Sequence, residues 1–170
     1  MDLLISYPWG RFRAARHDVV DILKRFGDDH PQIWRTAVEG IAWVSTCLDN
    51  REVTRRCGEL FRSDPLAFQN AVKWVPVDYW CDTSLEEMKK LVEEKIRPQI
   101  AEHETWGMKV EKRRWQRHHT AEIVAYLAPS IDRKVNLDNP NKWLRIDVVG
   151  RQTAISLVKA GDVFSSTAID

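Results

Sequence analysis

Glycine is sparse in this sequence and is never clustered. The chain has 170 residues and seven glycines, and no two of these lie closer than eleven residues apart. A loop that cradles a nucleotide, acetyl-CoA or S-adenosylmethionine needs closely spaced glycines, because only glycine lets the backbone approach a phosphate so closely. The sequence therefore predicts no cofactor and excludes the common glycine-rich cofactor loops.

Cysteine and histidine are too few, and too poorly spaced, for a metal site. The three cysteines, Cys47, Cys57 and Cys81, form an odd set that fits neither a metal knuckle nor a secreted disulfide framework. The adjacent pair His118 and His119 diverges in any regular element and cannot chelate as an i, i+4 pair would. We expect free thiols and no bound metal.

Long apolar runs are also missing. No segment approaches the roughly 18 to 20 apolar residues of a membrane helix, and residues 1–13 lack the basic, apolar, small-residue order of a signal peptide. Apolar residues make up 44% of the chain and charged residues 30%, which is typical of a packed globular protein. We expect a soluble, cytoplasmic protein with no membrane partner.

The net charge is only +1, but the basic residues are concentrated in the second half of the chain. Residues 1–84 carry 11 basic and 12 acidic side chains, whereas residues 105–151 carry 10 basic and 5 acidic ones. The densest stretch is Lys109–His119, KVEKRRWQRHH. Lys and Arg neutralise phosphates, and a Trp among them offers a surface to an unpaired base. The alternative is a solvated strand edge that is kept basic against aggregation.

A second basic stretch surrounds the sequence DNPNKW. Asn-Pro and Asn-Lys mark a turn that would expose amide and ammonium donors. Read in isolation it is a plain connecting turn, and beside the first stretch it is a second-rank candidate for RNA contacts. Its polar residues are Arg133, Lys134, Asn136, Asn139, Lys142 and Arg145.

The apolar pattern of residues 1–81 predicts the order β-α-β-β-α-β. Gly27 is placed to end the first helix, Glu39-Gly40 to form a two-residue hairpin turn, and Pro76 to mark a sheet edge or bulge. This order is the split βαβ, or ferredoxin-like, arrangement, with two helices on one face of a four-stranded antiparallel sheet. The expected strands are residues 3–7, 33–38, 41–48 and 70–81, and the helices are residues 12–26 and the segment from Asp49 to Pro65.

The remaining residues predict a second domain. Ser84 with Glu87 forms a capping box that opens a helix, which Pro98 interrupts. Met108–Trp115 alternates as a strand does, and Thr120 can cap a short helix. Further strands are expected at residues 135–137, 143–149 and 153–158. With the boundary at Asp82–Ser84, the predicted domains are residues 1–83 and 84–170.

Taken together, these pieces resemble the THUMP domain, an RNA-binding module of thiouridine synthases, RNA methyltransferases and pseudouridine synthases. In that family a helical pair leads to a strand ending in basic residues, a short helix, a V-x-L-x-x-P strand and a final G-x-x-x-x-I-S strand. The likeness covers roughly residues 84–165, and THUMP domains typically follow a ferredoxin-like domain, so the expected class is α+β. The matching segments are MKVEKRRWQRHH (108–119), TAEIVAYLA (120–128), KVNLDNP (134–140) and GRQTAIS (150–156).

The segment Val72–Val92 is similar to the join found in stand-alone THUMP proteins that assist tRNA cytidine acetylation. It departs from them in lacking an arginine before the proline, where Trp74 and Val75 stand. The resemblance implies a tRNA-binding adaptor that holds the acceptor arm and 3′ end. It implies that the chain itself is not catalytic. It also implies a separate tRNA-modifying enzyme, such as a cytidine acetyltransferase, as the partner. The RNA-contact residues that it implies are Lys109, Lys112, Arg113, Arg114, Arg117 and His119, with Asn139 and Lys142 in second rank.

Two other hypotheses stay open at this point. A small RNA-modifying enzyme could use Cys81 with His118 or His119, which requires those residues to converge in a pocket. A protein-interaction module could instead use a surface built from some of the eight tryptophans, with the basic strand serving solubility.

Overall fold

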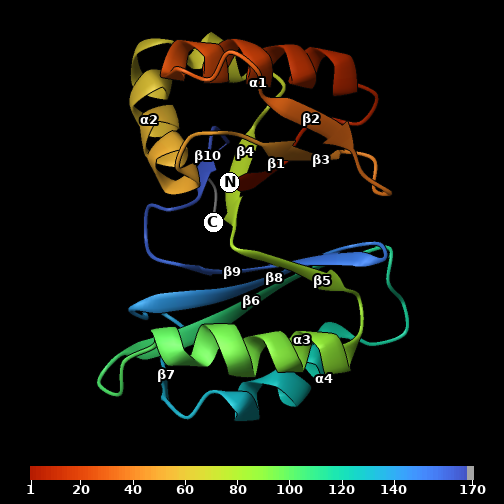
Figure 1. Ribbon diagram of the computed structural model, residues 1–170, viewed down its shortest axis with the longest axis vertical. Coiled ribbons are helices and arrows are strands. Elements are labelled where there is room, and N and C mark those ends of the chain that lie inside the picture. The colour runs from red at the N-terminus through yellow and green to blue at the C-terminus, as the bar shows by residue number, and fades with distance from the viewer. Residues whose placement is uncertain (168–170) are drawn as a thin grey trace. The chain divides into compact units, whose positions relative to one another are not determined.

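The computed structural model describes residues 1–167, which belong to two compact units. The first unit contains Met1–Val77 and the segment that begins at Gly161, and the second contains Asp78–Ala160. The chain thus enters the second unit at Asp78, ahead of the expected Asp82–Ser84 boundary, and later returns to the first. Each unit is a mixed α/β structure with one sheet and helices on one of its faces (Figure 1).

The first unit has a five-stranded antiparallel sheet in the order β10-β4-β1-β3-β2, with α1 and α2 packed on it (Figure 1). The 3-10 helix Pro65–Phe68 follows α2. The elements are β1 (Asp2–Ser6), α1 (Phe12–Phe26), β2 (Gln32–Arg35), β3 (Ile41–Ser45), α2 (Asn50–Ser63), β4 (Lys73–Val77) and β10 (Phe164–Ser165).

Local sequence signals set the bounds of both helices. The α1 helix ends at Gly27, whose φ of 112° is left-handed and whose N–H donates to the Lys24 carbonyl. The α2 helix begins after Asp49, whose side chain accepts a 2.9 Å hydrogen bond from the Glu52 N–H. Both ends match the predictions. The helices bury apolar residues against the sheet, and Trp74 of β4 is fully buried in that core.

The hairpin turn predicted at Glu39-Gly40 is wrong in its length. Arg35 pairs with Ala42, so residues 36–40 all lie between β2 and β3. The Thr36 hydroxyl donates a 2.8 Å hydrogen bond to the Ile41 carbonyl and closes this longer loop. A side-chain bond of this kind replaces the tight backbone turn that the Glu-Gly pair suggested.

The single strand predicted over residues 70–81 is two strands in two sheets. Lys73–Val77 is β4 of the first sheet, and Tyr79–Asp82 is β5 of the second. Pro76 is tolerated in β4 because β10 pairs only with Trp74 and Lys73, so the edge of β4 at Pro76 needs no donor there. Periodicity could not show the break, because extended residues continue on both sides of Asp78.

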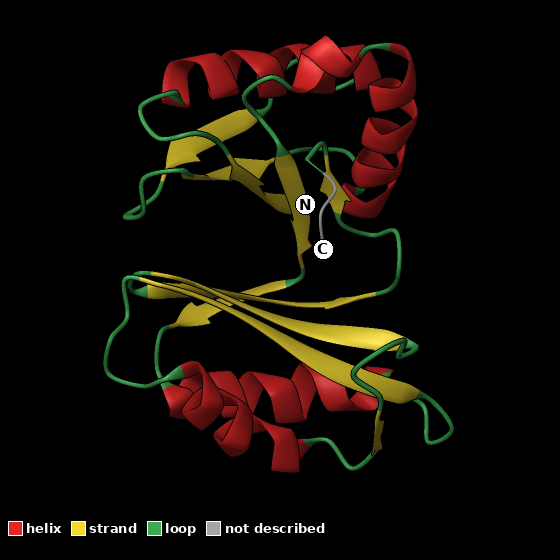
Figure 2. Cartoon of the chain, turned by 180° about the vertical axis from the view of Figure 1, so that it is seen from behind, coloured by secondary structure: helices red, strands yellow, loops and turns green. Residues whose placement is uncertain are grey.

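The second unit has a five-stranded sheet in the order β5-β9-β8-β6-β7 with α3 and α4 on one face (Figure 2). The β6 strand runs parallel to β7 and β8, and the β5–β9 and β8–β9 pairs are antiparallel. The remaining elements are α3 (Leu85–Leu91), β6 (Thr105–Arg113), α4 (Thr120–Leu127), β7 (Lys134–Val135), β8 (Lys142–Val149) and β9 (Gln152–Val158).

The helical segment after Ser84 changes form as it nears its proline. The Ser84 hydroxyl accepts from the Glu87 N–H at 3.1 Å and caps α3, as predicted. A π-helical turn, Val92–Ile96, follows, and a 3-10 turn, Arg97–Gln99, contains Pro98. The π-helical turn is wider than an α-helical turn and the 3-10 turn is tighter. This change of form accommodates Pro98, which has no backbone N–H to donate. Among the described residues, no helix is long and apolar enough to span a bilayer.

Close packing at the start of β6 requires a residue without a side chain. A Cβ built on Gly107 would lie 2.6 Å from Cζ3 and 2.9 Å from Cε3 of Trp143 on the neighbouring strand β8. Real Cβ atoms essentially never come so close, because the repulsion is steep. Gly107 therefore lets the Trp143 indole lie flat on the sheet.

Replacing Gly107 by alanine should destabilise the second unit. The added methyl group forces the indole or the strand to move, and overpacking of this kind lowers the free energy of unfolding by about 1–3 kcal/mol. Gly58→Ala is the matched control, because Gly58 lies within α2 with open space around its Cβ position, and we expect that variant to gain about 0.4–1 kcal/mol. Urea denaturation measures both, and equal stability of the two variants would contradict the packing account.

Candidate nucleic-acid interface

The two basic stretches of the sequence lie at opposite ends of β6. Trp106, near the start of β6, pairs with Val135 of β7 and Lys142 of β8, which places the turn of residues 136–141 beside it. Arg113 ends the strand, seven residues further on. Seven extended residues span about 23 Å at roughly 3.3 Å each. The structure therefore does not bring the eight predicted contact residues into a single site.

The end of β6 carries a group of exposed arginines and one histidine, which we call the basic end and define as Arg114, Arg117, His119 and Arg151. The first three lie in the loop between β6 and α4 and are exposed. Arg151 is exposed in the two-residue turn between β8 and β9. The Gly150 N–H donates a 3.0 Å hydrogen bond to the carbonyl of Arg113, which joins the turn to the loop. The basic end is thus built from two separate segments.

Sequence reasoning missed Arg151, although a signal for it was present. Arg151 lies in the segment GRQTAIS, which matches the final strand of the THUMP pattern, but it is not among the eight predicted RNA contacts. Gly150-Arg151 separates two strongly apolar strands, which is the pattern of a two-residue hairpin turn. Such a turn exposes its side chains at a sheet end, so the exposure of Arg151 could have been predicted.

Several residues of the loop hold its shape. The Lys112 ammonium donates a 2.9 Å hydrogen bond to the carbonyl of His118. The His118 ring lies 3.1 Å from the Glu122 carboxylate and packs against the Trp115 ring, with centroids 5.2 Å apart. The hydrogen bond with His118, followed by that from the His119 N–H, lowers the pKa of Glu122 below its usual value. Lys112 and Trp115 are half-buried and support the loop from within.

Arg113 is engaged in a buried ion-pair network. One guanidinium nitrogen lies 3.3 Å from the Asp147 carboxylate. Arg145 donates two further 3.2 Å hydrogen bonds to the two oxygens of Asp147. Arg145 and Asp147 are almost fully buried, and every polar side-chain atom in such a network needs a partner. Arg113 is thus held within the sheet by an ion pair that it shares with Arg145.

Lys109 is exposed on the opposite face of the sheet from the helices. Its ammonium lies 4.4 Å above the ring of Trp143, the same indole that covers Gly107. A cation held over an aromatic ring keeps its charge and part of its hydration. Lys109 can therefore still meet a phosphate, although it lies four residues before the end of β6.

The start of β6 lies beside the turn of residues 136–141, and we call this region the turn end. Its polar side chains are largely engaged in contacts within the unit. The Lys142 ammonium lies 2.9 Å from the Glu104 carboxylate and donates a 2.6 Å hydrogen bond to the Gln99 carbonyl. The pKa of Glu104 is lowered first by the Ala101 N–H and then by Lys142. The Asn139 N–H donates to the side-chain oxygen of Asn136, and the rest of Asn139 is exposed.

The cysteine and histidines of the alternative enzyme hypothesis do not converge. Cys81 is in register with Thr153, Thr153 with Val148, and Val148 with Lys112, whose ammonium contacts the His118 carbonyl. Three strand spacings of about 4.8 Å separate Cys81 from Lys112 by roughly 14 Å. Burial raises the pKa of Cys81 to about 11, which disfavours the thiolate. The described residues also contain no group of three or more potential ligands placed to hold a metal ion.

Comparisons with known proteins place the fold. No protein-family model matches the chain, and no curated protein matches it. Solved structures do match. PH1313 from Pyrococcus horikoshii has a TM-score of 0.66 and 15% identity, over 93% of this chain and 55% of its own. A 4-thiouridine synthetase solved with RNA and ATP has a TM-score of 0.57 and 15% identity, over 96% of this chain and 41% of its own. A possible methylase from Clostridium difficile has a TM-score of 0.59 and 11% identity, over 95% of this chain and 42% of its own.

These neighbours correct one expectation of the sequence analysis. The sequence predicted a module with no catalytic role. The solved structures that share this fold, however, include a synthetase and a possible methylase. The chain spans 41% and 42% of those two proteins and 55% of PH1313. The fold therefore occurs within proteins named as enzymes, and the absence of a glycine-rich loop does not exclude a catalytic role.

Charge removal at the basic end should weaken binding to tRNA and reduce its dependence on salt. Each phosphate contact contributes roughly 0.7–0.9 to the slope of log affinity against log salt. The double substitution Arg114→Ala/Arg117→Ala should therefore reduce the slope by about 1.4–1.8. Arg97→Ala/Lys134→Ala removes equal charge from exposed positions near the turn end and should have the smaller effect. Filter binding at several salt concentrations tests this, and a larger effect of the second pair would move the site to the turn end.

Proposed function

We propose that this chain is the RNA-binding part of a tRNA-modifying enzyme and holds the acceptor arm and 3′ end of its substrate. The observation that carries this is the basic end, where three exposed arginines from two segments meet at one end of the sheet. Arginine recognises phosphate with several donors in a fixed geometry. The synthetase of similar fold was solved in complex with RNA, which supports RNA as the ligand.

Both halves of the chain support a ferredoxin-like domain followed by a THUMP domain. The first unit has the element order β-α-β-β-α-β, and its strands β4-β1-β3-β2 are antiparallel neighbours. This is the arrangement expected of the split βαβ fold. The second unit has a basic strand end, a short helix and two long final strands in the order of the THUMP signals. Three of the four THUMP-like segments fall on elements of the expected type, whereas KVNLDNP is a strand only at Lys134–Val135, and its expected strand over residues 135–137 is replaced by a turn.

The reaction that this RNA-binding part serves is one of three candidates. Methyl transfer and thiolation are the reactions named for the neighbours of similar fold. Cytidine acetylation is the reaction implied by the resemblance of Val72–Val92 to the join in the acetylation group. All three reactions require the substrate to be oriented toward a catalytic centre.

The form of the basic end favours an RNA terminus over a continuous helix. Its cations project from a loop and a turn tip, which can surround a short single strand. We expect an acceptor minihelix with its unpaired 3′ tail to compete with tRNA, and trimming the tail to weaken binding by on the order of tenfold, equal to one or two base contacts. Mobility-shift competition measures this. Equal affinity for tailed and blunt minihelices would refute the 3′-end assignment while leaving general RNA binding intact.

In cells, loss of this chain should remove a modified nucleoside from tRNA. Nucleoside mass spectrometry of tRNA from a deletion strain should lack a methylated, thiolated or acetylated base that the parent contains. Re-expression of the wild-type gene should restore it. The variant Arg114→Ala/Arg117→Ala should restore less, while Arg97→Ala/Lys134→Ala should restore it nearly fully. An unchanged nucleoside profile in the deletion strain would contradict a role in tRNA modification.

A further inference from the structure

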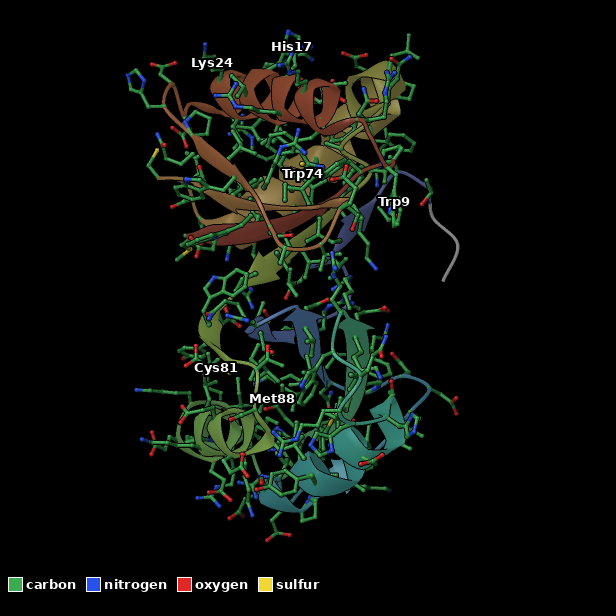
Figure 3. The ribbon with its side chains drawn as sticks, turned by 90° about the vertical axis from the view of Figure 1, so that its right-hand side faces the viewer. Trp9, His17, Lys24, Trp74, Cys81 and Met88 are labelled. Carbon is green, nitrogen blue, oxygen red and sulfur yellow. The ribbon has the colours of Figure 1, made fainter. Side chains whose placement is uncertain are left out.

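The outer face of α1 in the first unit carries cations that have no partner. At 100° per residue, Arg13, Arg16, His17 and Lys24 fall within one arc of about 100°, and the buried residues of the helix occupy a separate arc. All four are exposed, and none of their side chains forms a hydrogen bond or ion pair with another described residue. Figure 3 shows His17 and Lys24 on the side of α1 that points away from the sheet.

This face differs from the other charged surfaces of the first unit. Arg25 bonds Asp21 and Asp64, and Arg55 bonds Glu52 and Glu59 on α2. On α1 itself, the Asp21 carboxylate is paired with Arg25, and the Asp18 carboxylate accepts hydrogen bonds from the side chain and backbone of Asn70 and from Ala71. Neither acid forms an ion pair with Arg13, Arg16 or Lys24.

An exposed tryptophan lies at the beginning of the same helix. Trp9 precedes α1 and is 81% exposed, the highest value of any large apolar residue described. One edge of its indole rests against the backbone of Gly40, where a Cβ would lie 3.2 Å from Cδ1. The loop is held there because the Tyr7 N–H donates to the Gly40 carbonyl and the Gly10 N–H donates to Glu39. The ring is thus fixed at one edge while most of it remains open to solvent.

We propose that Trp9 and the cationic face of α1 form a second RNA-binding surface. Phosphates lie along Arg13, Arg16 and Lys24, which span about 16 Å of helix at 1.5 Å per residue, and an unpaired base stacks on the indole. The proposal rests on the proposed function in taking RNA as the ligand. RNA supplies both a row of anions and a flat aromatic face, and stacking on Trp requires no particular base.

A protein partner fits this surface less well. Interfaces between proteins have an apolar core that is depleted of charge. On the outer arc of α1, the apolar residue between the cations is Val20, which is half-buried. Trp9 alone does not provide an apolar patch of the required size. The composition of the surface therefore favours a polyanion.

The test uses the full chain and whole tRNA. Arg13→Gln/Arg16→Gln should weaken binding about fivefold or more and reduce the salt slope by about 1.4–1.8, as expected for two phosphate contacts. Trp9→Ala should weaken binding at least fivefold with an unchanged slope, because stacking releases no counterions. Trp9→Phe should retain most of the affinity. The charge-matched control is Arg55→Gln/Arg62→Gln, on the exposed side of α2, and it should behave close to wild type.

The outcomes separate this inference from the proposed function. If Arg114→Ala/Arg117→Ala weakens tRNA binding while Arg13→Gln/Arg16→Gln matches the α2 control, the α1 surface is wrong and the proposed function stands. If the wild-type chain does not bind tRNA, both are wrong. Ultraviolet cross-linking gives a second readout that does not depend on variants. RNA attached to the peptide that contains Trp9 supports the inference, and cross-links confined to the second unit contradict it.

Discussion

The parallel pairing of β6 with β8 is the constraint on which the second unit depends. Parallel neighbours cannot be joined by a tight turn, so the chain must cross over between them, and here α4 makes that crossing. The crossover packs Ile123 and Leu127 into the core beneath the sheet. It also separates what the sequence placed close together, because the loop leaves β6 at one end and the chain re-enters β8 at the other. The basic end and the turn end are consequences of this connection.

Much of the fold was predictable because it depends on local chemistry. The apolar spacing of α1, its glycine cap, and the caps at Asp49 and Ser84 each act within a few residues. The split of residues 70–81 between two sheets was not predictable, because the pairing partners of β4 and β5 lie about 67 to 92 residues away in sequence. For the same reason β10, two residues long, carried no local signal.

The candidate site was predictable in composition and less so in geometry. Counting basic residues locates the densest basic segment, but it cannot tell an exposed cation from one that is already paired. Arg113 and Lys142 form ion pairs with Asp147 and Glu104, which lie 34 and 38 residues from them in sequence. Arg117, from the same run as Arg113, is exposed. The available charge depends on long-range contacts, and only the three-dimensional arrangement reveals it.

Because the short strand β10 comes late in the chain, the first unit can complete its fold only near the end of synthesis. Its Phe164 is buried in a core whose other members all come from residues 3–74. A ribosome adds roughly 5–20 residues per second, so about 4–18 seconds pass between the emergence of β4 and that of β10. Throughout this interval the β4 edge is unpaired and the aromatic cluster around Phe68 lacks one ring. The unit that is made first is thus finished last, and its open edge would be the place where a chaperone or a misplaced strand acts on the nascent chain.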